Sequence, residues 1–131
     1  MTVYGDVECN NVYAMHRKFG FPTEQEPQLL EPDIMNDRYT HLAEELEEMR
    51  EAFLNSNLAE VADALVDMTV LIKGTAVMMG LPWNALWREV DRANMSKVVG
   101  TNAHRPDQEY DLIKPSGWVP PRIELILDGD L

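Results

Sequence analysis

Apolar residues recur at helical spacing through most of residues 6–98, and this pattern predicts helices rather than strands. Gly20 and Pro22 end the first run, Gly80 ends the third, and Pro82 stands where a fourth begins. The four expected helices cover about residues 6–19, 33–54, 58–79 and 82–98. The links after the second and third helices are short, which favours antiparallel neighbours. We therefore expect an all-α fold, an antiparallel four-helix bundle-like arrangement.

Glycine and proline interrupt the pattern from Val99 onward. This composition predicts a C-terminal arm with little regular structure over about residues 99–131. Within it, the short run Ile123–Leu127 fits either a last helical turn or a strand. The length of 131 residues fits one domain, so we expect residues 1–131 to form a single domain with its helical core over about 6–98.

The third expected helix is apolar on nearly every side. Between Leu58 and Met79 the only charged residues are Glu60, Asp63, Asp67 and Lys73. A helix of this kind is buried, either within its own fold or between subunits. We therefore expect a homo-oligomer, a dimer or a tetramer, whose core includes this helix.

The charge balance limits the possible partners. Eleven Lys and Arg against 23 Asp and Glu give a net charge of −12, which argues against direct nucleic-acid binding. The opening residues, Met1 to Asp6, contain neither the basic nor the apolar region of a secretory signal. Asp67 and Lys73 interrupt the most apolar stretch, which argues against a membrane span. With only one cysteine, Cys9, a disulfide framework is excluded, and we expect a cytoplasmic protein.

Two groups of carboxylates stand on the second and third expected helices. They are Glu44, Glu45 and Glu48 on the second, and Glu60, Asp63 and Asp67 on the third. At helical spacing the first group falls within an arc of about 100° and the second within about 60°. The second group lies inside an apolar stripe, where an isolated carboxylate is very costly. Divalent cations with oxygen ligands, Mg²⁺ or Mn²⁺, relieve that cost, and four or more carboxylates could hold two of them.

The same residues have a simpler interpretation that the pattern leaves open. The glutamates of the second helix also fit a solvated helix surface, and Asn57 with Glu60 also fits a helix cap. The Glu-x-x-His motif of di-iron bundles is absent, because no glutamate precedes a histidine by three positions. A metal site and a solvated acidic face therefore remain the two alternatives at this point.

The order of the acidic residues resembles a known signature. Glu44-Glu45-x-x-Glu48 followed by Glu60-x-x-Asp63 resembles the EExxE…ExxD pattern of the MazG-like all-α nucleoside triphosphate pyrophosphohydrolases of phages and bacteria. The gap of eleven residues between the two motifs is at the lower edge of the family's range. Four further segments resemble the family in the same order: residues 12–20, 58–67, 89–97 with its Asn-x-x-Lys, and 114–121. The resemblance covers most of the chain from about Asp6.

The resemblance implies a MazG fold and a metal-dependent hydrolysis. A nucleoside triphosphate would be converted to the monophosphate and pyrophosphate by water attack at the α-phosphate, with Mg²⁺ or Mn²⁺ and two or more ions per site. The implied metal ligands are Glu45, Glu48, Glu60 and Asp63. The implied catalytic residues are Glu44, which would orient or deprotonate the water, with Glu45 and Glu48. Asn94 and Lys97 match groups that contact the phosphates, and Asp67 would lie behind the metal ligands or serve as an alternative one.

The base and the cellular purpose stay open. Asn10, Asn11, Tyr13 and Trp83 could form a base pocket, although each also fits a helix cap or a core position. The family includes enzymes for dUTP and, in a phage branch, for dGTP, so guanine and uracil nucleotides are both candidates. Housecleaning and remodelling of a phage dNTP pool are equally compatible with the sequence. Two alternatives remain: a phosphoribosyl-ATP pyrophosphohydrolase with the same fold and metal chemistry, and a non-catalytic helical oligomerisation module.

Overall fold

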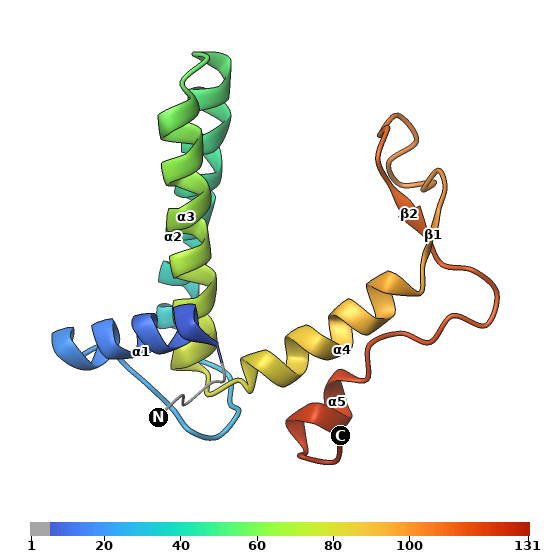
Figure 1. Cartoon of the computed structure of the whole chain (residues 1–131). Helices are drawn as coiled ribbons and strands as arrows, with labels where there is room; N and C mark the ends of the chain where they lie inside the picture. The colour runs from blue at the N-terminus through green and yellow to red at the C-terminus, as the bar shows by residue number, and fades with distance from the viewer. Residues whose placement is uncertain (1–5) are drawn as a thin grey trace. The chain divides into compact units, whose positions relative to one another are not determined.

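The computed structural model describes residues 6–131, and the expectation about a signal segment falls largely on residues 1–5, outside the described residues. The described chain contains five helices and two strands of two residues each, which confirms the all-α fold class (Figure 1). Its contacts divide into two compact units, one ending at Trp83 and one running from Asn84 to Leu131. The single domain stays a prediction, and the two units are described separately below.

The first unit begins with α1 (Val7–Phe19), which packs against α3 (Leu58–Met78). The Asp6 side chain caps the helix by accepting a hydrogen bond from the Cys9 N–H at 2.8 Å. Lys73 of α3 donates to both oxygens of Asp6 at 3.0 and 3.2 Å. Residues Cys9, Val12 and Val77 form a small buried core beneath this helix. These contacts fix α1 on the C-terminal half of α3.

The main feature of the first unit is an antiparallel hairpin of two long helices. It consists of α2 (Pro32–Leu54) and α3 (Leu58–Met78), packed together along their length (Figure 1). Pro32 stands at the first turn of α2, where its missing N–H costs nothing. Asn57 caps α3 by accepting a hydrogen bond from the Glu60 N–H at 3.1 Å. The predicted bounds of both helices are confirmed within about one residue.

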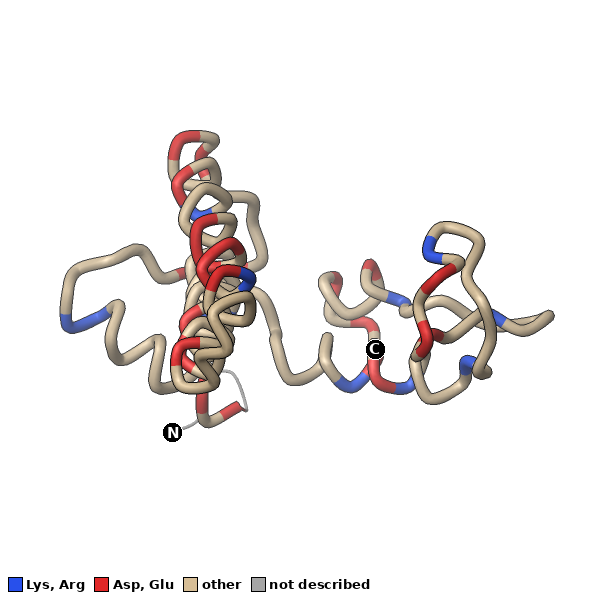
Figure 2. The backbone as a smooth tube through the Cα atoms, turned by 90° about the horizontal axis from the view of Figure 1, so that it is seen from above, with Lys and Arg blue, Asp and Glu red and all other residues tan. Residues whose placement is uncertain are grey.

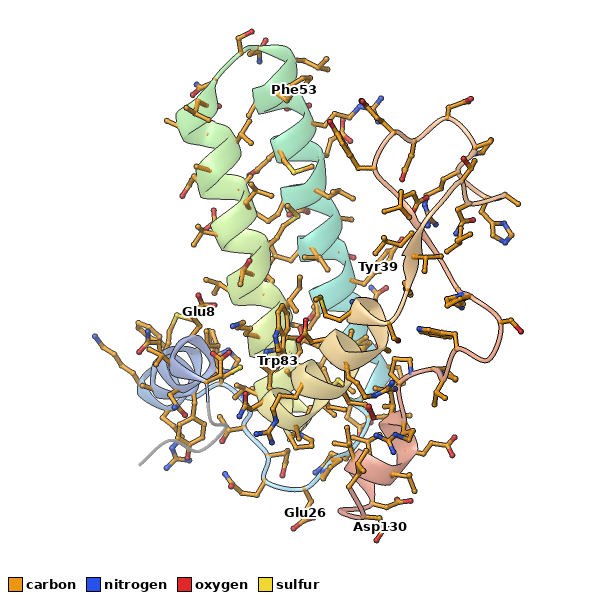
Figure 3. The ribbon with its side chains drawn as sticks, turned by 45° about the vertical axis from the view of Figure 1, so that its right-hand side comes forward. Glu8, Glu26, Tyr39, Phe53, Trp83 and Asp130 are labelled. Carbon is orange, nitrogen blue, oxygen red and sulfur yellow. The ribbon has the colours of Figure 1, made fainter. Side chains whose placement is uncertain are left out.

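Within the chain, only part of the hairpin's apolar surface is covered. Leu71, Ala76 and Val77 of α3 are buried, whereas Leu58 and Val66 nearer the turn are exposed. Apolar residues of α2 are also open, since Leu46 and Phe53 are 54% and 72% exposed. Phe53 stands beside the turn between the two helices (Figure 3). The oligomer expected from this surface stays a prediction.

The second unit contains α4 (Trp83–Met95), a small hairpin and α5 (Ile123–Leu127). Trp83, the first residue of α4, is the last residue of the first unit. The hairpin pairs β1 (Val98–Val99) with β2 (Leu112–Ile113) in antiparallel register, Val98 opposite Ile113. The prediction that the fourth helix reaches Val98 is wrong, because α4 ends at Met95. The Ser96 and Lys97 N–H groups donate hydrogen bonds to the carbonyls of Ala93 and Asn94, three residues earlier, and so close the helix with a tighter turn. The arm expected to be irregular thus carries one strand pair and one helix.

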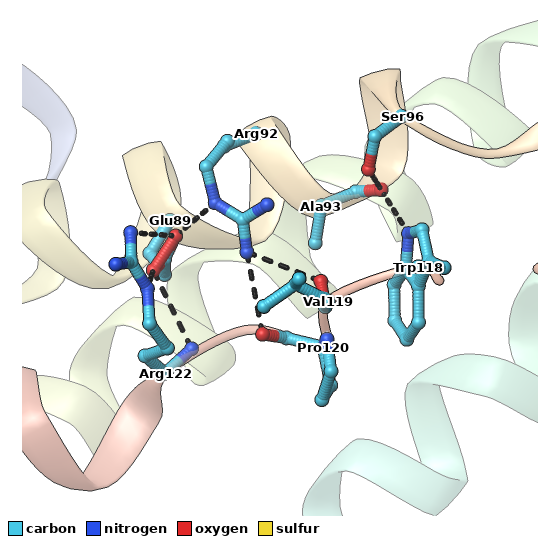
Figure 4. Close-up of polar contacts among 8 residues, drawn as sticks. All are labelled: Glu89, Arg92, Ala93, Ser96, Trp118, Val119, Pro120 and Arg122. Carbon is cyan, nitrogen blue, oxygen red and sulfur yellow. Dashed lines mark hydrogen bonds and ion pairs between the residues drawn. The ribbon is translucent and has the colours of Figure 1, made fainter. Parts of the chain in front are cut away.

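A buried glutamate ties the C-terminal segment to α4. Glu89 is 5% exposed and accepts hydrogen bonds from Arg122 Nε at 3.0 Å and Nη2 at 3.3 Å, and another from Arg92 Nε (Figure 4). Arg92 Nη2 also donates to the carbonyls of Val119 and Pro120, each at 3.2 Å. The hydrogen bonds from Arg122 and Arg92 hold the pKa of Glu89 down to about 2.

The pH dependence of the second unit follows from Glu89. Its pKa is lowered on folding, so its contribution to stability is present above the ordinary glutamate pKa and is lost as the pH falls through about 4.5 toward 2. We expect Glu89→Gln to lower the Tm at pH 7 and to flatten the fall of Tm with acid. Glu124→Gln, at an exposed position of α5, should change neither. Thermal melts monitored by near-ultraviolet circular dichroism between pH 3 and 7 test this, and an unchanged acid profile in Glu89→Gln would contradict it.

No single helix among the described residues is long and apolar enough to cross a membrane. The consecutive helices Leu58–Met78 and Trp83–Met95 reach that length and apolar composition only when they are counted as one bent pair.

Candidate active site

An acidic groove lies near the turn of the α2–α3 hairpin. It has a volume of about 360 Å³. Its lining residues come from both helices and are mostly acidic: Glu48, Glu51, Ala52 and Asn55 from α2, with Glu60, Asp63 and Ala64 from α3. Acidic positions recur along this hairpin in Figure 2. The structure thus brings together three of the four predicted metal ligands, Glu48, Glu60 and Asp63, in one groove.

The fourth predicted ligand, Glu45, lies one turn before Glu48 in an unfavourable environment. Its side chain is 12% exposed, and its Oε2 atom is buried with no hydrogen-bond partner. Burial raises the pKa of Glu45, and the negative charges of Glu48 and Asp67 raise it further. His41, whose Nε2 lies 3.6 Å from Glu45 Oε1, opposes this only in part. Three carboxylates from two helices therefore crowd one another at this point.

The donor atoms of these residues suit a hard divalent cation. An orphaned carboxylate oxygen costs free energy unless a proton or a cation satisfies it. The donors are all oxygens, the set that Mg²⁺ and Mn²⁺ prefer. No three His, Cys, Asp or Glu side chains within residues 6–131 are gathered closely enough to hold an ion as they stand.

A second cavity adjoins the same carboxylates on the side away from the turn. Its volume is about 460 Å³, and Glu45 and Asp67 form part of its wall. The rest of the wall consists of the Arg38 guanidinium, the imidazoles of His16 and His41, and the apolar side chains of Met15, Phe21, Val70 and Leu71. The carboxylates Glu45 and Asp67 thus face this cavity, while Glu48, which crowds Glu45, faces the groove near the turn.

The other predicted residues of the first unit lie elsewhere. Glu44 is exposed next to Glu45 and lines neither the groove nor the cavity. Tyr13 and Trp83 pack against the core of Cys9, Val12 and Val77, and the Trp83 indole N–H is buried without a hydrogen-bond partner.

Asn10 and Asn11 lie on α1, where Asn10 is half-buried and Asn11 exposed. None of the four residues of the expected base pocket lines the cavity beside Glu45. A base pocket made of these four stays a prediction.

The two predicted phosphate contacts belong to the second unit. Asn94 is exposed near the end of α4. Lys97 follows that helix, and its Nζ lies 5.5 Å from the centre of the Trp118 ring, which also has Lys114 Nζ at 5.0 Å. The Trp118 ring is held by a hydrogen bond from its Nε1 to the Ala93 carbonyl at 2.8 Å. Two ammonium groups therefore gather around one fixed indole.

The sequence interpretation missed several residues of the site. Glu51 and Asn55 continue the face of Glu48 at helical spacing, so the period that selected Glu48 could also have selected them. Arg38 and His16 carried no such signal. His16 lies on α1 and Arg38 on α2, and both lie beside Gly74 of α3. Only the packing of the three helices brings these residues together.

Comparison with known proteins identifies the family of this chain. The family model described as phosphoribosyl-ATP pyrophosphohydrolase matches residues 12–94, well over half of the chain. That stretch contains every carboxylate of the groove and the cavity, as well as Asn94. No curated protein matches the chain. The chain belongs to the phosphoribosyl-ATP pyrophosphohydrolase family, a member of the MazG-like all-α nucleoside triphosphate pyrophosphohydrolase superfamily, and carries a pyrophosphohydrolase domain.

Proposed function

We propose that this chain is a metal-dependent nucleoside triphosphate pyrophosphohydrolase that releases a nucleoside monophosphate and pyrophosphate. The observation that carries the proposal is the buried, unpartnered Glu45 Oε2, crowded by the carboxylates of Glu48 and Asp67. A bound cation would satisfy this oxygen beside an acidic groove, and a triphosphate is a ligand that brings cations with it. The pyrophosphohydrolase activity of the family supports the same reaction.

We assign the metal ligands to the carboxylates that face one another across the hairpin. Glu45 and Glu48 would hold Mg²⁺ or Mn²⁺ from α2, with Glu60 and Asp63 from α3. Asp67 is a further candidate, because its charge acts on Glu45 directly. When bound, two or more such ions would neutralise the triphosphate and lower the pKa of a water molecule.

The remaining chemistry falls to the chain's own side chains. We assign Glu44, the first glutamate of the EExxE pattern, to orient the attacking water and to accept its proton. The water oxygen forms a bond to the α-phosphorus, the bond from that phosphorus to the bridging oxygen breaks, and pyrophosphate leaves with the electron pair. Asn94 and Lys97 are proposed to contact the phosphates, Lys97 as a point charge and Asn94 as a neutral donor.

Phosphoribosyl-ATP is the second candidate substrate, because the family that matches residues 12–94 is described by that activity. The same carboxylates would serve, since the bond broken again joins the α-phosphorus to pyrophosphate. A preference between this substrate and a common nucleotide depends on what surrounds the base rather than on the metal site.

Product analysis tests the proposal and separates the two candidates. We expect purified protein with Mg²⁺ or Mn²⁺ to convert one or a few members of a panel to monophosphate and pyrophosphate. The panel comprises the four NTPs, the four dNTPs, dUTP and phosphoribosyl-ATP, and chromatography identifies the products. Turnover of phosphoribosyl-ATP alone would select the second candidate. Release of diphosphate and phosphate would contradict the reaction, and no turnover together with no effect of metal on the Tm would leave a helical oligomerisation module.

A further inference from the structure

The cavity of about 460 Å³ beside Glu45 has the size and lining of a small-molecule site. Four apolar side chains, Met15, Phe21, Val70 and Leu71, form much of its wall. Apolar walls suit the flat face of a nucleobase, whereas a phosphate group requires donors on several sides. The carboxylates of Glu45 and Asp67 border the same cavity and would repel an anion placed inside it.

The cavity contains one cationic group, the guanidinium of Arg38, with no carboxylate paired to it within residues 6–131. Arg38 Nε donates to Thr75 Oγ1 at 3.0 Å, and Nη2 donates to the Leu71 carbonyl at 2.9 Å. Burial lowers the pKa of Arg38. A guanidinium has five N–H donors, so these two bonds leave three for a ligand. Because both bonds run to α3, the group is held in place before any ligand arrives.

The backbone of α3 is shaped to admit this guanidinium. A Cβ atom on Gly74 would lie 2.6 Å from Arg38 Nη2 and 3.1 Å from His16 Nε2. Any residue larger than glycine would therefore displace the guanidinium or the buried imidazole. His16 donates from Nδ1 to the Pro22 carbonyl at 3.2 Å, which holds its ring beside Gly74. The position of Arg38 in the cavity thus depends on a glycine within a helix, where glycine is otherwise unfavourable.

We propose that this cavity binds the base of the substrate and that Arg38 selects a 6-oxopurine, guanine or hypoxanthine, by donating to its O6 and N7 atoms. The inference rests on the proposed function, since it places the base of the nucleotide next to the carboxylates that hold its metal. Arginine matches the two neighbouring acceptors of guanine with two parallel hydrogen bonds. Adenine presents an amino donor where guanine has O6, so one N–H of Arg38 would face another donor. A pyrimidine offers only one such acceptor on that edge.

Binding of uncharged nucleosides tests the inference without metal, phosphate or turnover. We expect the protein to bind deoxyguanosine more tightly than deoxyadenosine by a factor between about 5 and 150, the range for one bidentate arginine contact. Arg38→Lys keeps the charge but loses the fork, so it should weaken deoxyguanosine binding by a similar factor and leave deoxyadenosine binding unchanged. Arg50→Lys is the matched control, because Arg50 lies on the same helix and borders a different groove. Titration followed by nuclear magnetic resonance measures such weak affinities.

A second variant keeps the test decisive if Arg38→Lys does not fold. Gly74→Ala leaves every donor in the chain but forces the Arg38 guanidinium to move, so it should also abolish the preference for deoxyguanosine. Equal affinity of the wild-type protein for both nucleosides would overturn the inference. So would an equal loss of both affinities in Arg38→Lys. Deoxyguanosine binding at Arg38 without pyrophosphate release from any nucleotide would uphold this inference and refute the proposed function. Turnover of dATP as fast as dGTP would uphold the proposed function and refute this inference.

Discussion

Replacing Asp63 by Asn or Glu48 by Gln is expected to reduce kcat/KM on the order of 10³-fold while leaving the helical fold intact. The two side chains line the same groove, one from α3 and one from α2. Each substitution preserves size and shape but replaces one carboxylate oxygen by an NH₂ group and removes a negative charge that suits a hard cation. Loss of one group that stabilises transition-state charge costs about 10²–10³ in rate in other enzymes, which is about 3–4 kcal/mol of barrier. Steady-state kinetics with the substrate found by product analysis measures the effect.

The matched control for that experiment is Glu47→Gln. Glu47 lies on the same helix, immediately before Glu48, but borders the apolar groove formed with Leu46, Phe53 and Val61. The change in net charge is the same, so an effect of overall charge would appear equally in both variants. We expect Glu47→Gln to keep kcat/KM within about twofold and circular dichroism to show the same helix content in all variants. Near-normal activity in Glu48→Gln or Asp63→Asn would remove these residues from the metal site.

The parts of the fold and the site that local patterns encode were predictable from the sequence. Gly20, Pro32 and Asn57 act on the backbone within a few residues, so they mark helix ends without any knowledge of the tertiary fold. The facing carboxylates of α2 and α3 were predictable for a similar reason, since helical period and a short connection are enough to oppose Glu48 and Asp63.

The rest depends on contacts between distant residues. Arg38 acquires its place from Thr75 and Leu71, which are 37 and 33 positions away, and no local pattern marks it. Val98, which was expected to extend α4, instead pairs with Ile113, a residue that lies outside the sequence of α4. The assignments of the metal ligands and of the base pocket stay predictions. What the structure adds is the crowding of Glu45 by Glu48 and Asp67, which a bound cation would relieve.

Millimolar Mg²⁺ or Mn²⁺ is expected to raise the Tm of the wild-type protein, and Glu45→Gln is expected to lose that rise. A ligand that binds only the folded state stabilises it by about 2.7 kcal/mol at a hundredfold excess over Kd. The pKa of Glu45 is raised in the folded protein, so the metal-free native state binds more protons than the unfolded chain and its stability falls as the pH rises through that range. A cation replaces the proton, so the stabilisation by metal should grow between pH 5 and pH 8.

The same argument predicts that metal-free Glu45→Gln melts at a higher temperature than the metal-free wild-type protein at pH 8. The substitution removes the charge that Glu48 and Asp67 oppose, and an amide can occupy the site without ionising. With Mg²⁺ present the order should reverse, because only the wild-type carboxylate gains from the ion. Differential scanning calorimetry at pH 5 and pH 8, with Mg²⁺ and with chelator, measures the difference in Tm between the two proteins under each of the four conditions. Glu47→Gln is the control variant, whose Tm should follow that of the wild-type protein. A Tm of metal-free Glu45→Gln below that of the wild-type protein would show that Glu45 stabilises the hairpin by itself, and the physical case for a cation between α2 and α3 would then be lost.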